Sequence, residues 1–235
     1  MILNPGQTSG NRLLAALPSE PYERLAPHLE PVSFLLGEVV YESGGQMRHV
    51  YFPTTSHISL LYTMIDGSTA EMGLVGNEGV VGISLFMGGE TTPNRAMVQG
   101  GGAAFRMKAK AMLDEFKRGS DFQHLLLRYT QALITQISQT AVCNRLHSVE
   151  QRLCRWLLMT HDRADSDELQ MTHEFISNML GVRREGVTMA AQRLQEIRMI
   201  SYVRGHIIIL DRKQLLARVC ECYQVVKDEH TRLLG

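Results

Sequence analysis

Residues 171–211 read MTHEFISNMLGVRREGVTMAAQRLQEIRMISYVRGHIIILD and decide the fold of the C-terminal part of the chain. Apolar residues repeat at helical spacing within 175–180 and again within 182–194. Gly181 lies between the two patterns, where a helix has to stop and a glycine takes the left-handed conformation without a Cβ penalty. The pattern therefore predicts two helices joined by a tight turn, the helix-turn-helix arrangement.

The end of this stretch predicts a β-hairpin. The runs 200–203 and 206–210 are rich in β-branched residues, and Arg204-Gly205 between them suits a two-residue turn. A helix-turn-helix followed by a hairpin is a winged helix. Many helical corners with a glycine bind nothing, but here the spacing of Ser177, Gly181 and Val187 coincides with the hairpin, which favours DNA binding.

The second helix carries side chains that reach phosphates or base edges. Its outward positions are Arg183, Arg184, Glu185, Thr188, Met189, Gln192 and Arg193. Residues 181–213 hold seven basic and three acidic residues, whereas residues 148–180 hold three basic and six acidic ones. Since the whole chain has 24 Lys+Arg and 24 Asp+Glu, the basic charge is local to the motif, as a phosphate-contacting surface requires.

Length and composition indicate an ordinary globular protein. A chain of 235 residues, 44% hydrophobic and 20% charged, is long enough for one large domain or two ordinary ones. The longest apolar runs are far below the roughly 20 residues that span a bilayer. Residues 1–11 lack the basic start and apolar middle of a secretory signal. We expect no membrane contact and a cytoplasmic location.

The cysteines do not show the spacing of a metal site. Cys143, Cys154, Cys220 and Cys222 include no CxxC pair and no group near the N-terminus, so neither zinc nor an iron–sulfur cluster is expected. Residues 213–234 predict one amphipathic helix on which Cys220 and Cys222 point to different faces. We interpret them as small structural residues, with a redox switch as the alternative.

The N-terminal half predicts a β-structure after an initial helix. Residues 13–29 are helical in pattern, with Ser19 as the N-cap. Short strands separated by glycine-containing turns are then predicted at 32–36, 39–41, 50–52, 58–64, 70–75, 80–83, 96–99 and 103–107. This pattern is typical of a sandwich or jelly-roll barrel. No segment matches a GxxxxGK[ST] phosphate loop, so nucleotide hydrolysis is not expected.

A long helix is predicted to start at Phe122, after a shorter one at 108–118. Its apolar seam alternates spacings of three and four over nearly three heptads: Leu126, Tyr129, Leu133, Ile137, Thr140 and Asn144. Leu125, Leu127, Ile134 and Ala141 widen the stripe. The helix either covers only its own barrel or packs on a partner as well, and periodicity alone does not decide. Because DNA sites read by winged helices are usually two-fold, a homodimer is expected.

A bend is predicted near Ser148, where Ser148 and Gln151 form a capping box. The predicted boundary follows from it. Residues 1–147 form a sensory domain that ends in a dimerisation helix at about 122–147, and residues 148–235 form the winged-helix domain. Residues 162–168 read as a loop, and the helix at 213–234 is expected to pack on the DNA-binding domain.

The order of these parts resembles the Crp/Fnr family, bacterial transcription regulators related to the cyclic-AMP receptor protein. The resemblance covers essentially the whole chain and is strongest over 172–203, where Thr172, Gly181 and Arg184-Glu185-x-Val187 fit. In the β-rich half, the residues that still match the family's pattern are Gly79–Gly82 and Asn94-Arg95. The resemblance implies an α+β fold: an N-terminal double-stranded β-helix or jelly-roll of cyclic-nucleotide-binding type, a long dimerisation helix and a C-terminal winged helix-turn-helix.

The resemblance also implies roles for individual residues. Arg184 matches the arginine that reads a guanine, and Glu185 the glutamate that accepts from a cytosine, which agrees with their chemistry. An ion pair in which Glu185 orients Arg184 is a further role. Met189 replaces a second base-reading arginine, so the half-site should overlap with a TGTGA-type box without equalling it. The predicted DNA-binding residues are Thr172, Arg183, Arg184, Glu185, Thr188, Met189, Gln192 and Arg204.

The implied effector site departs from the cyclic-AMP-binding members. Those members grip the ribose with Gly-Glu and the phosphate with Arg-Ser, whereas here Ile83 follows Gly82 and Ala96 follows Arg95. Ile137 stands where a threonine meets the adenine. Ribose hydroxyls facing isoleucine would lose charge-assisted bonds of roughly 1.5–3 kcal/mol each. Gly82, Arg95 and Ile137 are therefore predicted to bind an unidentified effector other than a cyclic nucleotide.

Some alternatives stay open. Arg95 either holds another anion or forms a surface ion pair. His28, His49 and His57 are either haem ligands or surface residues, the commoner role of scattered histidines. The sequence as a whole predicts a homodimeric transcription regulator that reads a palindromic site, with RNA polymerase as an implied further partner. The alternative is a sensory or scaffold protein whose winged helix contacts proteins. No enzyme is expected, because no nucleophile–base pair stands out.

Overall fold

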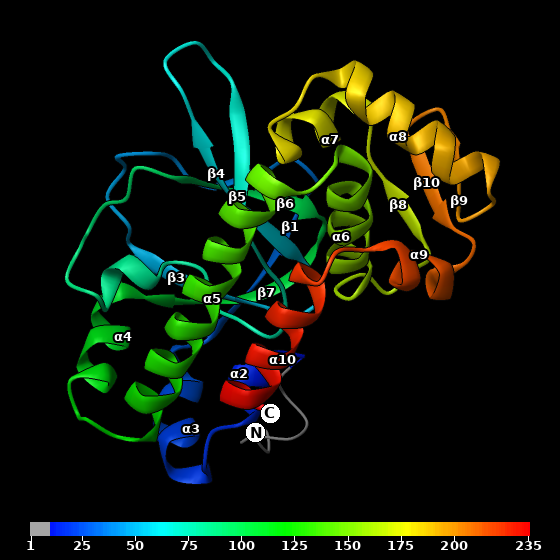
Figure 1. Cartoon of the computed structure of the whole chain (residues 1–235). Helices are drawn as coiled ribbons and strands as arrows, with labels where there is room; N and C mark the ends of the chain where they lie inside the picture. The colour runs from blue at the N-terminus through cyan, green and yellow to red at the C-terminus, as the bar shows by residue number, and fades with distance from the viewer. Residues whose placement is uncertain (1–9) are drawn as a thin grey trace.

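The computed structural model describes residues 10–235 (Figure 1). Residues 1–9 lie outside the described residues. They make up most of the segment 1–11, for which the sequence predicts no secretory signal. The described chain begins with the helices α2 (Arg12–Ala15) and α3 (Ser19–Leu25) and the 3-10 turn η1 (Ala26–His28). The helical pattern predicted over 13–29 forms as separate short pieces, because proline disfavours helical backbone at the residue before it and Pro18 therefore separates α2 from α3. Pro18, not Ser19, is the N-cap residue of α3.

The β-rich half is a roll of two antiparallel sheets, as predicted. One sheet has the order β1-β7-β3 and the other β2-β6-β4-β5. The strands are β1 (Glu30–Phe34), β2 (Val39–Tyr41), β3 (His49–Pro53), β4 (His57–Thr63), β5 (Thr69–Val75), β6 (Arg95–Gly100) and β7 (Gly102–Lys108). Phe52, Ile58, Val98 and Met107 are fully buried inside the roll. Apolar side chains from both sheets therefore fill one shared core.

The strand predicted at 80–83 does not form. Only Val81 makes an isolated bridge, to Tyr51, and Gly82 takes a φ of 105° before the turn η2 (Ile83–Leu85). A Cβ atom on Gly79 would lie 2.5 Å from the Tyr129 hydroxyl oxygen. The segment is thus shaped by its close approach to a helix, a contact that local sequence does not reveal.

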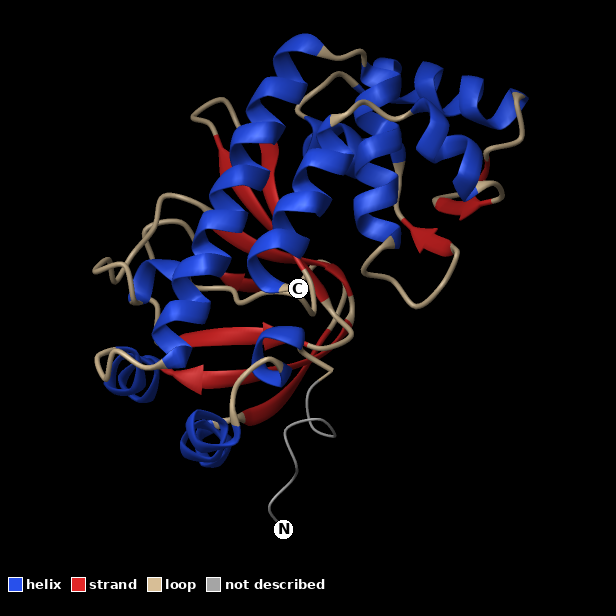
Figure 2. Cartoon of the chain, turned by 60° about the horizontal axis from the view of Figure 1, so that its bottom comes forward, coloured by secondary structure: helices blue, strands red, loops and turns tan. Residues whose placement is uncertain are grey.

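The long helix α5 (Asp121–Leu146) follows α4 (Ala109–Phe116) and lies along the roll (Figure 2). The predicted seam faces the chain's own core, since Leu126, Tyr129 and Leu133 are at most 1% exposed. Leu127 and Ile134, which widen the stripe, remain 49% and 53% exposed. One row of α5 thus packs within the chain, and a second row faces outward.

The C-terminal part is built on α6 (Val149–His161), which begins with the predicted capping box of Ser148 and Gln151. It continues through α7 (His173–Leu180), α8 (Arg184–Glu196) and a sheet of order β8-β10-β9. Its strands are β8 (Glu168–Gln170), β9 (Ile200–Val203) and β10 (His206–Ile209). β8 was not predicted, because its first residue was assigned to the preceding polar loop. The core of this part includes Leu61 and Leu74 from β4 and β5, so the two halves share apolar packing.

The chain ends in two helices, α9 (Arg212–Arg218) and α10 (Cys222–Leu234), where the sequence predicted one helix over 213–234. α9 packs on α6, but α10 turns back and packs mainly along α5 (Figure 1). The expectation that the whole segment packs on the winged helix is therefore wrong for α10. No helix among residues 10–235 has the length and hydropathy needed to cross a membrane.

Candidate nucleic-acid interface

The turn of the helix-turn-helix is fixed by side chains and by Gly181. The Thr172 hydroxyl oxygen accepts the N–H of Phe175 at 3.1 Å and so caps the start of α7. At the other end, Gly181 takes a φ of 59°, and the Val182 N–H bonds to the Ser177 carbonyl at 3.0 Å. Arg152 of α6 donates to the Leu180 carbonyl. Both ends of α7 are therefore satisfied, as the sequence predicted for Gly181.

The outward face of α8 holds most of the predicted DNA-binding residues. Val187, Ala190 and Leu194 are buried beneath it, and the helix lies on the outer side of the molecule (Figure 1). The residues found exposed are Thr172, Arg183, Arg184, Glu185, Met189, Gln192 and Arg204. Thr188 is half-buried, because its hydroxyl donates to the Arg184 carbonyl at 3.0 Å and lies 3.0 Å from Nδ1 of His173.

The wing forms at the predicted turn. Arg204 and Gly205 have φ values of 49° and 87°, so both central residues are left-handed, as a type I′ hairpin turn requires. A Cβ atom on Gly205 would lie 3.5 Å from Cγ2 of Thr172. The turn of the wing, which carries Arg204, therefore adjoins the start of α7.

His173 supports this face and was not predicted. Its ring stacks on Tyr202 of β9, with 4.0 Å between centroids and 19° between planes, and its Nδ1 contacts Thr188 of α8. Burial, and then the charge of Arg184, lower the pKa of His173. His173 thus joins α7, α8 and the wing. No local pattern could have revealed this role, because it depends on two contacts distant in sequence.

Three arginines around α8 and the wing have no acidic partner among the described residues. Among residues 10–235, no ion pair involves Arg183, Arg184 or Arg204, and none joins Arg184 to Glu185. Arg193 instead lies 3.8 Å from Glu150. A guanidinium group that is exposed and unpaired remains available for a phosphate or a guanine edge.

The predicted effector residues have different neighbours. A Cβ atom on Gly82 would lie 3.2 Å from Val50, and Ile137 of α5 lies near Gly73 of β5. Nη2 of Arg95 lies 3.0 Å from the Glu42 carboxylate, so the surface ion pair left open for this arginine is present. A shared effector site of Gly82, Arg95 and Ile137 stays a prediction.

The three candidate haem ligands lie in separate elements, His28 in η1, His49 in β3 and His57 in β4. Burial lowers the pKa of His57 to about 4. Its ring occupies the space beside Gly100, where a Cβ atom would lie 2.0 Å from the imidazole. His57 is therefore a packed, neutral group inside the roll.

The cysteines lie differently from the prediction. Cys220 and Cys222 do not belong to one helix, because α9 ends at Arg218 and α10 begins at Cys222. The break turns both side chains toward Cys143 and His147, and the four ligand atoms lie within 4.8 Å of one another. The sequence did not predict this group, since Cys143 and His147 lie at the end of α5, more than 70 residues before Cys220 and Cys222.

The chain thus joins a β-roll through a long helix to a winged helix with unpaired arginines. This is the architecture of DNA-binding proteins that have a separate N-terminal domain. Residues 151–218 match the Crp-like helix-turn-helix domain family. No curated protein sequence matches the chain. The match makes residues 151–218 a Crp-like helix-turn-helix domain, and the order of the roll, the long helix and this domain is the one that the resemblance to the Crp/Fnr regulators predicts.

Solved structures support the same fold. FixK2 from Bradyrhizobium japonicum is 16% identical, with a TM-score of 0.69 over 82% of this chain and 98% of FixK2. A structure from Eubacterium rectale, described as a transcriptional regulator of the Crp/Fnr family, is 18% identical, with a TM-score of 0.66 over 87% and 96% of the two chains. The CRP-family regulator TTHB099 from Thermus thermophilus is 17% identical, with a TM-score of 0.66 over 87% and 98%.

Proposed function

We propose that the protein acts as a homodimer that reads a two-fold symmetric DNA site and that an effector bound by the roll regulates this reading. The observation that carries the proposal is the exposed, unpaired arginine set of Arg183, Arg184 and Arg204 around α8 and the wing. In this proposal Arg184 and Glu185 contact base edges, and Thr172, Gln192 and Arg204 contact the backbone.

The exposed row on α5 supports the homodimer. Leu127, Ile134 and Val142 are 49%, 53% and 45% exposed, and their spacings of seven and eight residues keep them on one side of the helix. The opposite row is already buried against the roll, so the exposed row is free for a second copy of α5. A two-fold axis brings the same row of both copies together and pairs two recognition helices with two half-sites.

The junction of α5 and α6 is the proposed hinge between a sensory part, residues 1–147, and a DNA-binding part, residues 148–235. His147 and Ser148 separate the two helices with extended backbone. An effector that binds one hinge arrangement better shifts the population of dimers whose recognition helices fit the site. In this proposal the effector regulates DNA binding by changing the fraction of dimers in each hinge arrangement.

The experiment that tests the proposal compares Arg184→Ala with Arg48→Ala in binding to a DNA site selected from random sequence. Arg184→Ala should weaken binding by about 1–3 kcal/mol, with the loss concentrated at one base pair of each half-site. Arg48 is exposed on the roll, away from the winged helix, so Arg48→Ala should bind as the wild type does. Unchanged affinity of Arg184→Ala would instead favour a winged helix that contacts proteins.

A further inference from the structure

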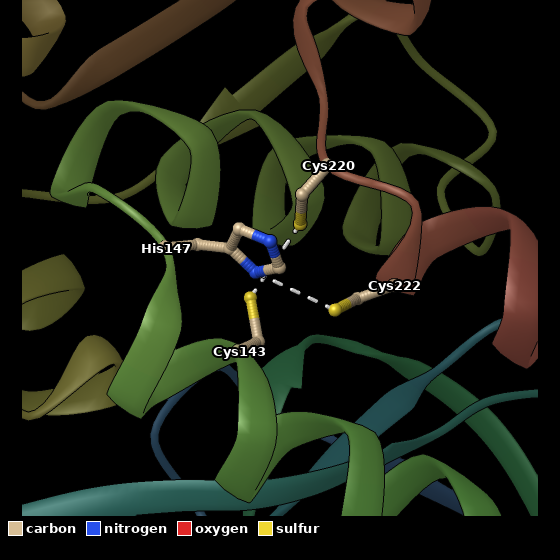
Figure 3. A group of neighbouring side chains, drawn as sticks. All are labelled: Cys143, His147, Cys220 and Cys222. Carbon is tan, nitrogen blue, oxygen red and sulfur yellow. Dashed lines mark hydrogen bonds between the residues drawn. The ribbon is translucent and has the colours of Figure 1, made fainter.

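Three cysteines and one histidine meet where the end of α5 touches the joint between α9 and α10 (Figure 3). Cys143 lies in the last turn of α5, and His147 follows four residues later, so the two side chains lie on the same side of the helix end. Cys220 and Cys222 flank Glu221 in the joint. All three cysteines are at most 4% exposed.

The distances fit a single tetrahedral ion. Sγ of Cys143 lies 3.6 Å from Sγ of Cys220, and Sγ of Cys222 lies 3.6 Å from Nδ1 of His147. Thiolates about 2.3 Å from one zinc ion stand about 3.8 Å apart at the corners of a tetrahedron. The group thus needs only small side-chain movements to take one ion. A cluster of several irons separates its thiolate ligands further than this group does.

The surroundings of His147 match those of a metal ligand. Its Nδ1 faces the sulfur atoms, and its Nε2 lies 3.4 Å from the Glu221 carboxylate. A carboxylate on the far nitrogen fixes the ring and its tautomer, as is usual for histidines bound to zinc.

We propose that Cys143, His147, Cys220 and Cys222 form a Zn²⁺ site. Three thiolates and one imidazole are a closed donor set of the kind that structural zinc sites use. The ion would join the end of α5 to the joint that leads into α10, and α10 packs back along α5. It would thereby hold the end of α5 against the start of α10. The proposal does not rest on the proposed DNA-binding function.

The test uses the full chain, purified under reducing conditions with zinc supplied. Atomic emission should find one zinc per chain. Replacement by Co²⁺ should give the intense near-ultraviolet band of cobalt–thiolate bonds and the visible bands of a tetrahedral site. Cys143→Ser and Cys220→Ser should lose both signals. Cys154 is buried in α6 outside the group, so Cys154→Ala is the matched control and should keep them.

A wild-type measurement keeps the test decisive if the serine variants do not fold. A thiol-reactive reagent should modify the native zinc-loaded chain slowly, and a strong chelator should accelerate that reaction at least tenfold. The absence of zinc and of the cobalt bands would overturn the proposal. So would a Cys143–Cys220 disulfide that persists under reducing conditions, or a loss of the cobalt bands in Cys154→Ala as large as in Cys220→Ser.

Discussion

Glu71 is a carboxyl group buried between β5 and α6, with only 7% of its surface exposed. Its oxygen lies 2.6 Å from the Ser59 hydroxyl, which also lies 2.7 Å from the Gln99 side-chain oxygen. One hydroxyl donates one hydrogen bond, so a protonated Glu71 satisfies the group by donating to Ser59 while Ser59 donates to Gln99. Burial, in agreement with this, raises the pKa of Glu71 to about 7.

The raised pKa of Glu71 predicts a pH-dependent stability. Between the ordinary pKa of 4.5 and the folded pKa of about 7, the folded chain holds a proton that the unfolded chain has lost, so stability falls as the pH rises through this window. Glu71→Gln stays neutral, and its free energy of unfolding relative to the wild type should rise by up to about 3 kcal/mol from about pH 5 to about pH 8.

Urea denaturation at the two pH values measures the effect of Glu71. Glu23→Gln replaces an exposed carboxylate and should leave the pH dependence of the wild type unchanged. If Glu71→Gln followed the same pH dependence as the wild type, Glu71 would not hold a proton in the folded chain.

The arrangement of α7 and α8 depends on Gly181, which ends α7 close to β5. Gly181 has a φ of 59°, and a Cβ atom there would lie 3.2 Å from Cβ of Ala70. Gly186 differs, because it lies inside α8 and a Cβ atom there would meet only Val149, at 3.9 Å. The two glycines of the same motif thus have opposite structural roles.

The same substitution should therefore act in opposite directions at the two sites. Gly181→Ala should lower the free energy of unfolding by about 1–2 kcal/mol or more, because a side chain is disfavoured in left-handed backbone and crowds Ala70. Gly186→Ala should raise it by roughly 0.5–1 kcal/mol, because alanine favours the helix. Denaturant unfolding followed by circular dichroism measures both. Equal effects of the same sign would contradict this account of the turn.

The elements also show which parts of the structure the sequence could predict. The Gly181 turn, the Ser148 capping box and the hairpin at Arg204-Gly205 depend on residues within a few positions, and all three predictions are confirmed. The missing strand at 80–83 and the break before α10 depend on packing against α5, which comes from distant sequence. The features that depend on neighbouring residues could be predicted from the sequence, whereas the features that depend on long-range contacts could not.

The candidate sites follow the same rule. The exposed residues of α8 were predicted because helical spacing tells inward from outward positions. The cysteine group was missed because Cys143 and Cys220 are 77 residues apart and have no motif spacing. His173 was missed because its stacking on Tyr202 exists only in the folded chain.

In the whole molecule, one side of α5 packs within the chain, and another side is proposed to pack on a second copy. Its inner row packs on the roll, α10 covers a further side, and the row of Leu127 and Ile134 remains exposed. In the proposed mechanism the long helix thus links the roll, the dimer contact and the winged helix.

A charge in the exposed row should separate the proposed dimer. Ile134→Asp should sediment as a monomer and bind a palindromic site more weakly than the wild type, because an aspartate at this position would be buried between two helices. Met87 is 59% exposed on the roll, close to the 53% of Ile134, so Met87→Asp is the matched control and should remain dimeric. Monomeric Ile134→Asp that binds the palindrome as tightly as the wild type would contradict the two-fold mechanism.

Selection of bound sequences from random DNA by the purified full chain tests whether the protein reads a two-fold site. We expect an enriched inverted repeat whose half-sites are centred about 34 Å apart, roughly 10 base pairs, the spacing at which two recognition helices enter successive major grooves. Enrichment of no sequence, or of a single unrepeated half-site, would contradict it.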